Sequence, residues 1–101
     1  MRIIVMLKPT NKRGTKTAYT KFREYLRKDG YVLMQPEVYM RTVTSRRAVA
    51  SHLSALSAKC PKTGTVRVLT LTEKQYGRIV VFSDSEDFQD NVVGARELVD
   101  L

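Results

Sequence analysis

The segment Arg2-Ile3-Ile4-Val5-Met6-Leu7 decides the fold of this chain of 101 residues. Nearly all of its side chains are β-branched or long and apolar, which predicts a β-strand. Because successive side chains of a strand point to opposite faces, Ile3, Val5 and Leu7 are expected on one face and Ile4 and Met6 on the other. Both faces are therefore expected to be buried. The apolar run of five residues is too short for a secretory segment or a membrane span, so we expect a cytoplasmic protein with no membrane partner.

The pattern beyond this segment predicts further strands and two helices. Helices are expected over 15–28 and 45–59, where apolar residues recur at helical spacing. Strands are expected over 31–34, 37–43 and 66–71, and another is expected within 75–82, centred on 79–81. The order β-α-β-β-α-β predicts a ferredoxin-like α+β fold, in which two helices cover one face of an antiparallel sheet. The other face keeps apolar side chains, so we expect two copies to pack back to back as a homodimer.

The two helices are expected to pack through one apolar stripe each. The first stripe comprises Ala18, Tyr19, Phe22 and Leu26, and the second comprises Val49, Leu53, Leu56 and Cys60. Gly30 is expected to end the first helix as a left-handed cap, and Thr44 or Ser45 to begin the second. His52 lies beside the second stripe and has no second ligand at a suitable spacing, so we do not interpret it as a metal ligand. A single cysteine excludes an internal disulfide and favours a reducing compartment.

Charge divides the chain into two parts. Residues 1–82 carry 17 basic and 4 acidic residues, whereas residues 83–101 carry 1 basic and 6 acidic residues. We therefore predict that 1–82 form a ferredoxin-like domain that binds nucleic acid through phosphates, since a polycation releases counterions on contact with them. Residues 83–101 are predicted to be an acidic C-terminal tail. Its apolar residues suggest an extra C-terminal strand that adds to a partner's sheet edge, with a disordered terminus as the alternative. The docking residues are Val92, Val93, Leu98 and Val99.

Several segments, in this order, carry a family resemblance. They are MRIIVM (1–6), AYTKFREYL (18–26), KDGY (28–31), VY (38–39), PKTG (61–64) and LTEKQY (71–76). Together they resemble the second CRISPR-associated protein family, the small partner of the CRISPR adaptation integrase, and its members from systems with a single large effector nuclease. The resemblance implies a ferredoxin-like homodimer that bridges two integrase dimers, with the duplex part of a new spacer lying across it.

The resemblance also implies a metal position, and this sequence departs from it. Many members carry hydrophobic-Asp-x-Pro at the end of the first strand, and the two aspartates of a dimer are assigned a divalent metal for phosphodiester hydrolysis. Here the segment is Leu7-Lys8-Pro9-Thr10, and no acidic residue precedes Glu24. Mg²⁺ requires oxygen ligands, and a pair of lysines would repel it. We therefore predict no catalytic residues, no metal ligands and no cofactor, with Mg²⁺ only if a nuclease reading holds. Glu37 is expected at the same edge of the sheet, in a salt bridge with Lys8.

The same region is expected to bind DNA. Lys8, Lys12, Arg13 and Lys16 form a basic lip on the loop after the first strand, and the resemblance places phosphate contacts around this loop. Arg46 and Arg47 are a second candidate, because backbone N–H groups at a helix start can hold a phosphate. No pattern for reading base edges is evident, so binding is expected to be insensitive to sequence.

The leading interpretation is a non-catalytic scaffold that holds duplex DNA for the integrase. Two alternatives stay open. One is a metal-dependent endonuclease of DNA or RNA that uses other carboxylates, and the other is a ribonuclease toxin of related fold. Lys8 argues against the first, and the acidic, apolar-tipped tail argues against the second.

Overall fold

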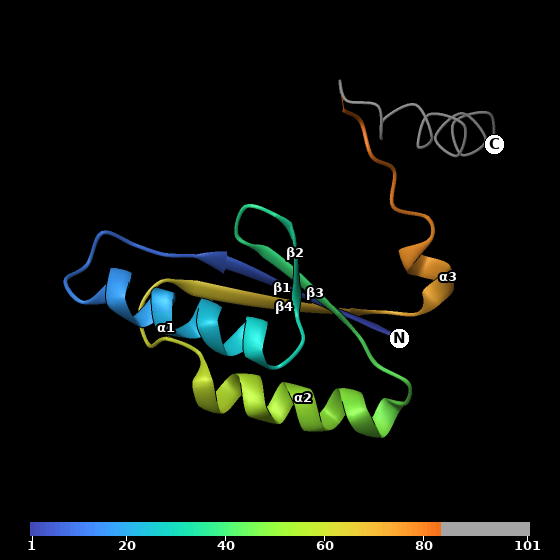
Figure 1. Ribbon diagram of the computed structural model, residues 1–101, viewed down its shortest axis with the longest axis horizontal. Helices are drawn as coiled ribbons and strands as arrows, with labels where there is room; N and C mark the ends of the chain where they lie inside the picture. The colour runs from blue at the N-terminus through green and yellow to red at the C-terminus, as the bar shows by residue number, and fades with distance from the viewer. Residues whose placement is uncertain (84–101) are drawn as a thin grey trace.

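The computed structural model describes residues 1–83 (Figure 1). The elements in chain order are β1 (Arg2–Lys8), α1 (Thr15–Lys28), β2 (Val32–Gln35), β3 (Val38–Thr42), α2 (Arg46–Lys59), β4 (Thr65–Leu71) and α3 (Glu73–Tyr76). The four strands form one antiparallel sheet in the order β2-β3-β1-β4. The first six elements confirm the predicted β-α-β-β-α-β order and the ferredoxin-like α+β fold. No helix among residues 1–83 combines the length and the apolar character needed to cross a membrane.

The core lies between the sheet and the two long helices. Ile3, Val5 and Leu7 project from the central strand β1 into this layer, and Ile3 and Val5 have no exposed surface. The helices contribute Tyr19, Phe22, Leu26, Val49 and Leu56, and the remaining strands and turns contribute Tyr31, Tyr39 and Val43. Burying a side chain of this size stabilises the fold by roughly 1.5–3 kcal/mol. The predicted stripe of α1 is confirmed, with buried Thr15 added at its start.

The stripe predicted for α2 is wrong at Leu53, which is 38% exposed. The helix is rotated so that His52 faces inward. There the Nδ1 of His52 lies 3.3 Å from the Oδ2 of Asp29, at the end of α1. The ring of Tyr31 meets the His52 ring edge to face, with centroids 6.2 Å apart. A polar contact with a neighbouring element therefore takes the place that the apolar pattern assigned to a leucine.

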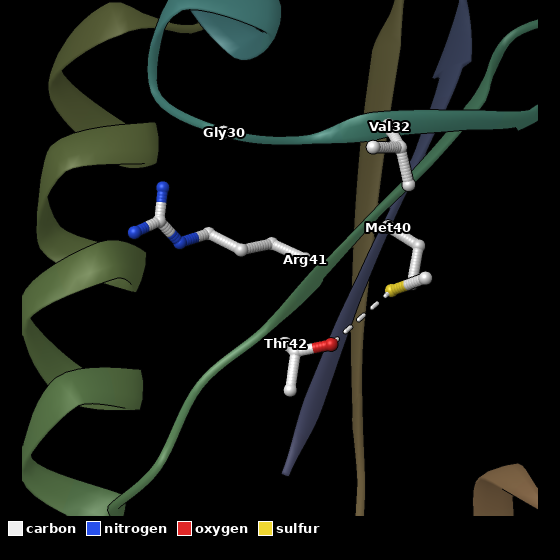
Figure 2. Close-up of a pocket in the computed structure, with 5 residues that line it drawn as sticks. All are labelled: Gly30, Val32, Met40, Arg41 and Thr42. Atoms are coloured by element: carbon white, nitrogen blue, oxygen red, sulfur yellow. Dashed lines mark hydrogen bonds between the residues drawn. The ribbon is translucent and has the colours of Figure 1, made fainter.

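Arg41 joins β3 to the same cluster. Figure 2 shows its side chain extending toward α2, while that of Met40 extends away from the helix. Its Nη1 lies 3.7 Å from the Oδ2 of Asp29. Gly30 has a φ of +95°, and a Cβ at this position would lie 2.7 Å from the Arg41 Nη1. The glycine therefore serves both as the predicted left-handed cap and as space for the guanidinium group.

The strand expected around 79–81 is wrong. Residues 73–76 form the short helix α3 and residues 79–82 are in neither helix nor strand. Thr72 and Gln75 form a capping box, in which the Thr72 Oγ1 accepts the Gln75 N–H at 3.1 Å and the Gln75 Oε1 accepts the Thr72 N–H at 2.9 Å. This local motif begins a helical turn. Nearly all of the acidic tail, with its four docking residues, lies outside the described residues.

The other face of the sheet is not covered by α1 or α2. Register places Ile4, Leu69 and Met40 side by side on it. Ile4, on the central strand, is 6% exposed, whereas Leu69, on the edge strand β4, is 48% exposed. Val32, next to Met40 on the edge strand, is 54% exposed. We call this apolar surface the open face. As expected from the sequence, both faces of β1 carry apolar residues and the helices cover only one of them.

Candidate nucleic-acid interface

The basic residues gather at one end of the sheet. At this end β1 stops, α1 begins, α2 stops and β4 begins (Figure 1). We call it the loop end. The exposed cations of its two loops, and of the strand and helix that flank the first loop, are Lys8, Lys12, Arg13, Lys16 and Lys62. Four of these five were predicted as the basic lip, and the structure brings them together.

The start of α1 suits an anion in its backbone as well as in its side chains. The N-cap is Gly14, with φ of 83°, and no side chain caps the first turn. That turn carries no acidic residue, and Lys16 lies within it. The first N–H groups of a helix have no partner within the helix, and the helix dipole favours negative charge there. Backbone and side chains at this position therefore attract the same kind of group.

Arg46 and Arg47 lie at the opposite end of the domain. The start of α2 follows β3, whose Thr42 pairs with Arg2 at the far end of β1 from Lys8. A strand of seven residues separates the two ends by roughly 20 Å. The Oγ of Ser45 already accepts the Ala48 N–H at 3.1 Å, so this helix start has a cap of its own. The two predicted groups of DNA-binding residues therefore form two regions, and only the loop end has an uncapped helix.

The expected salt bridge between Glu37 and Lys8 is wrong. The Nε of Arg23 donates to the Glu37 Oε1 at 2.9 Å and its Nη2 donates to the Oε2 at 2.7 Å. This forked pairing raises the pKa of the Arg23 guanidinium. The backbone explains the geometry, because Glu37 has a φ of +66° in the tight β2–β3 turn and its carbonyl accepts the Leu7 N–H at 2.8 Å. Arg23 takes the carboxylate, so Lys8 is left without an acidic partner in residues 1–83.

The described carboxylates do not fit a divalent metal. Asp29 faces Arg41 and His52, Glu37 faces Arg23, and Glu73 accepts from Arg2. No three His, Cys, Asp or Glu side chains in residues 1–83 converge as ligands would. Mg²⁺ needs oxygen ligands, and the end of β1 offers an ammonium group in their place. The described residues at this edge therefore do not supply the oxygen ligands that the resemblance implies for a metal.

One buried polar cluster lies away from the loop end. The Tyr31 hydroxyl and the Arg41 Nε are buried and have no hydrogen-bond partner among the described residues. Burial, together with the nearby Asp29 carboxylate, raises the pKa of Tyr31 to about 12. The contacts of this polar cluster connect α1, β3 and α2, and the cluster contributes no charge to the basic surface at the loop end.

Sequence reasoning missed Lys62 and Arg67. Lys62 belongs to the loop between α2 and β4, far along the chain from the lip. Arg67 pairs with Met6 and therefore projects from the open face beside Lys8, which pairs with Thr65. The PKTG segment was used only as a turn and as part of the resemblance. The basic character of Lys62 was visible, but its place beside the lip depends on the tertiary fold.

Comparisons with known proteins agree on one family. The family model described as CRISPR associated protein Cas2 matches residues 4–79. A CRISPR-associated endoribonuclease Cas2 of Acidovorax ebreus is 36% identical over 99 residues, which cover 97% of both chains. A protein of the same name from Streptococcus mutans is 33% identical over 86% of this chain and 81% of its own. Another from Parvibaculum lavamentivorans is 39% identical over 73% of each chain.

Proposed function

This chain belongs to the CRISPR-associated Cas2 family, and we propose that it acts there as a non-catalytic scaffold that binds duplex DNA during spacer acquisition in the cytoplasm. The observation that carries the proposal is the loop end. Five exposed cations gather there, and the one carboxylate at that edge among residues 1–83, on Glu37, is held by Arg23. Such a surface attracts a phosphate backbone and has no groups arranged to read bases.

The relatives named endoribonuclease favour a second candidate, a metal-dependent nuclease of DNA or RNA. Against it stands the chemistry of the β1 end. Lys8 lies where the family resemblance implies a metal-binding aspartate, and Glu37 is engaged with Arg23. A metal-activated water requires a held cation, and an ammonium pair would repel one. The scaffold reading needs only the positive charge that is present.

We also propose that the protein works as a homodimer through its open face. An apolar sheet face of this kind needs a cover, and a second copy related by a two-fold axis supplies an identical apolar surface. Residues 79–82, which are in neither helix nor strand, add to the exposed apolar surface, with Ile79 and Val81 both 42% exposed. Ile79 and Val81 line a hollow of about 260 Å³ together with Met34 of β2. Dimer formation would also double the basic field at the loop ends.

The integrase partner and the tail complete the proposal. The family resemblance implies that the homodimer bridges two integrase dimers. The tail, with Val92, Val93, Leu98 and Val99, is proposed as the docking segment, because it is too acidic for a DNA surface and carries apolar residues at its end. Truncation after Phe82 should leave DNA affinity intact and abolish co-purification with the integrase. A truncated protein that retains the integrase at full strength would overturn the docking role.

The DNA-binding proposal is tested by the salt dependence of binding to a labelled duplex of mixed sequence. If a dimer neutralises about four phosphates through Lys12 and Arg13, these residues should contribute about −3.6 to the slope of the logarithm of the association constant against the logarithm of the salt concentration. Replacing both residues by alanine should weaken binding to all sequences alike and flatten the slope. The matched variant removes two charges at the opposite end, by Arg46→Ala and Arg47→Ala. If only this second variant flattens the slope, the DNA-binding surface lies at the start of α2.

The nuclease alternative has its own test. Purified protein should leave duplex DNA and single-stranded RNA intact in the presence of Mg²⁺ or Mn²⁺. Cleavage that is lost in Glu37→Ala would show that this carboxylate leaves Arg23 to serve a metal. That result would overturn the scaffold reading.

A further inference from the structure

The loop between α2 and β4 is fastened to the basic lip by three contacts. The Thr63 Oγ1 lies 2.7 Å from the Oγ1 of Thr15, the first residue of α1. The Tyr19 hydroxyl donates to the Thr63 carbonyl at 2.7 Å, and the Tyr19 side chain has no exposed surface. Thr65 pairs with Lys8 at the end of β1. Residues 48 and 44 positions apart in sequence are thus joined directly at the loop end.

The turn allows no side chain at Gly64. Its φ is +71°, and a Cβ there would lie 2.5 Å from both the Lys8 carbonyl oxygen and the Tyr19 hydroxyl. The same Cβ would lie 3.2 Å from the Cα of Pro9. The two loops therefore pack backbone to backbone, which only glycine permits in this conformation. We call the contact of Thr63 and Gly64 with Thr15 and Tyr19 the joint. Lys62 directly precedes Thr63 and is exposed. In the other loop, the Lys12 carbonyl accepts the Thr15 N–H at 3.2 Å.

We propose that the loop of residues 61–65 is the second half of the phosphate-binding surface, with Lys62 as a phosphate contact. Tyr19 and Gly64 act as positioning residues that hold the two loops together. This inference rests on the proposed DNA-binding function, and it adds one contact residue and a device that orders both loops. A charged pair of loops that is already held in place loses less conformational entropy when it binds a duplex.

The positive charges around this joint favour the binding of an anion there. Lys8, Lys12 and Lys62 come from both loops, and none has a carboxylate partner among residues 1–83. Tying together loops of like charge costs free energy unless an anion lies between or across them. Two partly buried hydrogen bonds and a glycine nonetheless hold them together. The backbone of a duplex offers phosphates at regular spacing and so provides anions for both loops at once.

The first experiment compares Lys62→Ala with Lys28→Ala, which removes the same charge from the last turn of α1 at the other end of that helix. The probe is a labelled duplex of mixed sequence, titrated over a range of NaCl concentrations. Each phosphate contact contributes about 0.9 to the slope, or roughly eightfold in affinity at 0.1 M salt relative to 1 M. Lys62→Ala should therefore weaken binding several-fold and flatten the slope by about 1 for each subunit that contacts the duplex. Lys28→Ala should change neither quantity, and equal effects of the two variants would overturn the inference.

The second experiment tests the positioning role by coupling. Tyr19→Phe keeps the buried ring and removes only the hydroxyl. If this variant does not fold, Thr63→Val is used in its place, because it removes the hydroxyl contact with Thr15. Either variant should weaken DNA binding in the wild-type background and have a smaller effect when Lys62 is already alanine, because only the contribution of the first loop then remains. A merely structural joint would give additive effects, and additivity would overturn the positioning role.

The two levels of the proposal fail in different ways. If Lys12→Ala with Arg13→Ala weakens binding and Lys62→Ala does not, only the inference about the second loop is overturned. If neither variant changes the affinity or the slope, the loop end is not the DNA-binding surface and both are overturned.

Discussion

On the central strand β1, Ile3 and Val5 of the helix-covered face have no exposed surface and Ile4 of the open face is 6% exposed, whereas on the flanking strands of the open face Leu69 and Val32 are 48% and 54% exposed. The residue types are alike, and β1 supplies both faces by simple alternation. The covered face owes its burial to aromatic side chains of α1 and to the stripe of α2. Among residues 1–83, the open face is approached by the short helix α3 and by the segment after it, whose Ile79 and Val81 line a hollow with Met34 of β2.

This difference suggests separate roles for the two faces: the covered face stabilises the fold of one copy, and the open face is available for assembly with another surface. The free energy of folding comes mainly from the covered face, since its side chains leave water within a single copy. The open face is apolar yet gains little until another surface covers it. Its rim is charged, with an Arg2–Glu73 ion pair at one end and Lys8 and Arg67 at the other. A second copy and a DNA duplex can therefore use neighbouring parts of the same molecule.

The largest effect is expected from a cavity on the covered face. Phe22 is 2% exposed and belongs to the core cluster. Phe22→Ala should lower the free energy of unfolding by about 3–5 kcal/mol, measured by urea denaturation. Leu69→Ala, measured in dilute protein, should cost about 1 kcal/mol or less. Equal costs would show that the two faces contribute equally to folding.

A charge on the open face should act on assembly rather than on folding. Leu69→Asp would place a carboxylate in the proposed homodimer interface, where an unpaired charge costs about 3–5 kcal/mol. Sedimentation equilibrium should show a stable dimer for the wild type and a monomer for the variant. Ser54→Asp, on the exposed side of α2, is the control and should remain dimeric. A Leu69→Asp protein that dimerises as well as the wild type would place the interface elsewhere.

The covered face was largely predictable from the sequence, because periodicity reports which side of an element is apolar. The four core strands, both long helices, the Gly30 cap and the Ser45 cap follow from such local signals. Two local predictions were wrong for a physical reason. The Ile79–Val81 pattern favours a strand, but the capping box of Thr72 begins a helical turn just before it. The stripe of α2 pointed to Leu53, but the polar contact with Asp29 turns His52 inward.

The site was predictable only where it is contiguous in sequence. Lys8, Lys12, Arg13 and Lys16 lie within one loop and one helical turn, so their proximity follows from the chain itself. Lys62 joins them through hydrogen bonds of Thr63 to residues more than 40 positions away. The partner of Glu37 was missed for the same reason, because Arg23 reaches it from another element. Tertiary placement of single side chains leaves no periodic trace in a sequence.

Alkaline pH should destabilise the covered face through Tyr31. Burial raises its pKa from 10.0 to about 12 in the folded protein. Between these values the unfolded chain releases the proton and the folded chain retains it, so stability falls as pH rises from about 10 toward 12. The loss should reach about 2–3 kcal/mol. Tyr31→Phe should remove that part of the pH dependence in urea denaturation and leave stability at pH 7 similar or higher, because the buried hydroxyl has no partner among residues 1–83. A wild-type pH profile in the variant would contradict this assignment.

The smallest effect is expected where α3 meets the open face. The Arg2 Nε lies 3.0 Å from both carboxylate oxygens of Glu73, and the Arg2 guanidinium lies 4.2 Å from the centroid of the Tyr76 ring. The hydrogen bond from Arg2 lowers the pKa of Glu73 below its ordinary value of 4.5. A carboxyl group with a lowered pKa contributes stability above the unfolded value and loses it as pH falls through the folded value. Acid that protonates Glu73, at a pH below the ordinary carboxyl range, should therefore release α3 before it affects the core.

Glu73→Gln should reproduce that release at neutral pH. The Glu73 side chain is 55% exposed, and exposed ion pairs are worth little because water and salt screen them. The variant should shift the Arg2 Nε–H resonance and increase amide exchange in residues 73–77, while the midpoint of urea denaturation stays near that of the wild type. Glu24→Gln, on the exposed side of α1, removes the same charge and should leave both α3 signals unchanged. If Glu73→Gln instead lowers global stability as much as Phe22→Ala does, then α3 is part of the folding core, and the open face contributes to folding as well as to assembly.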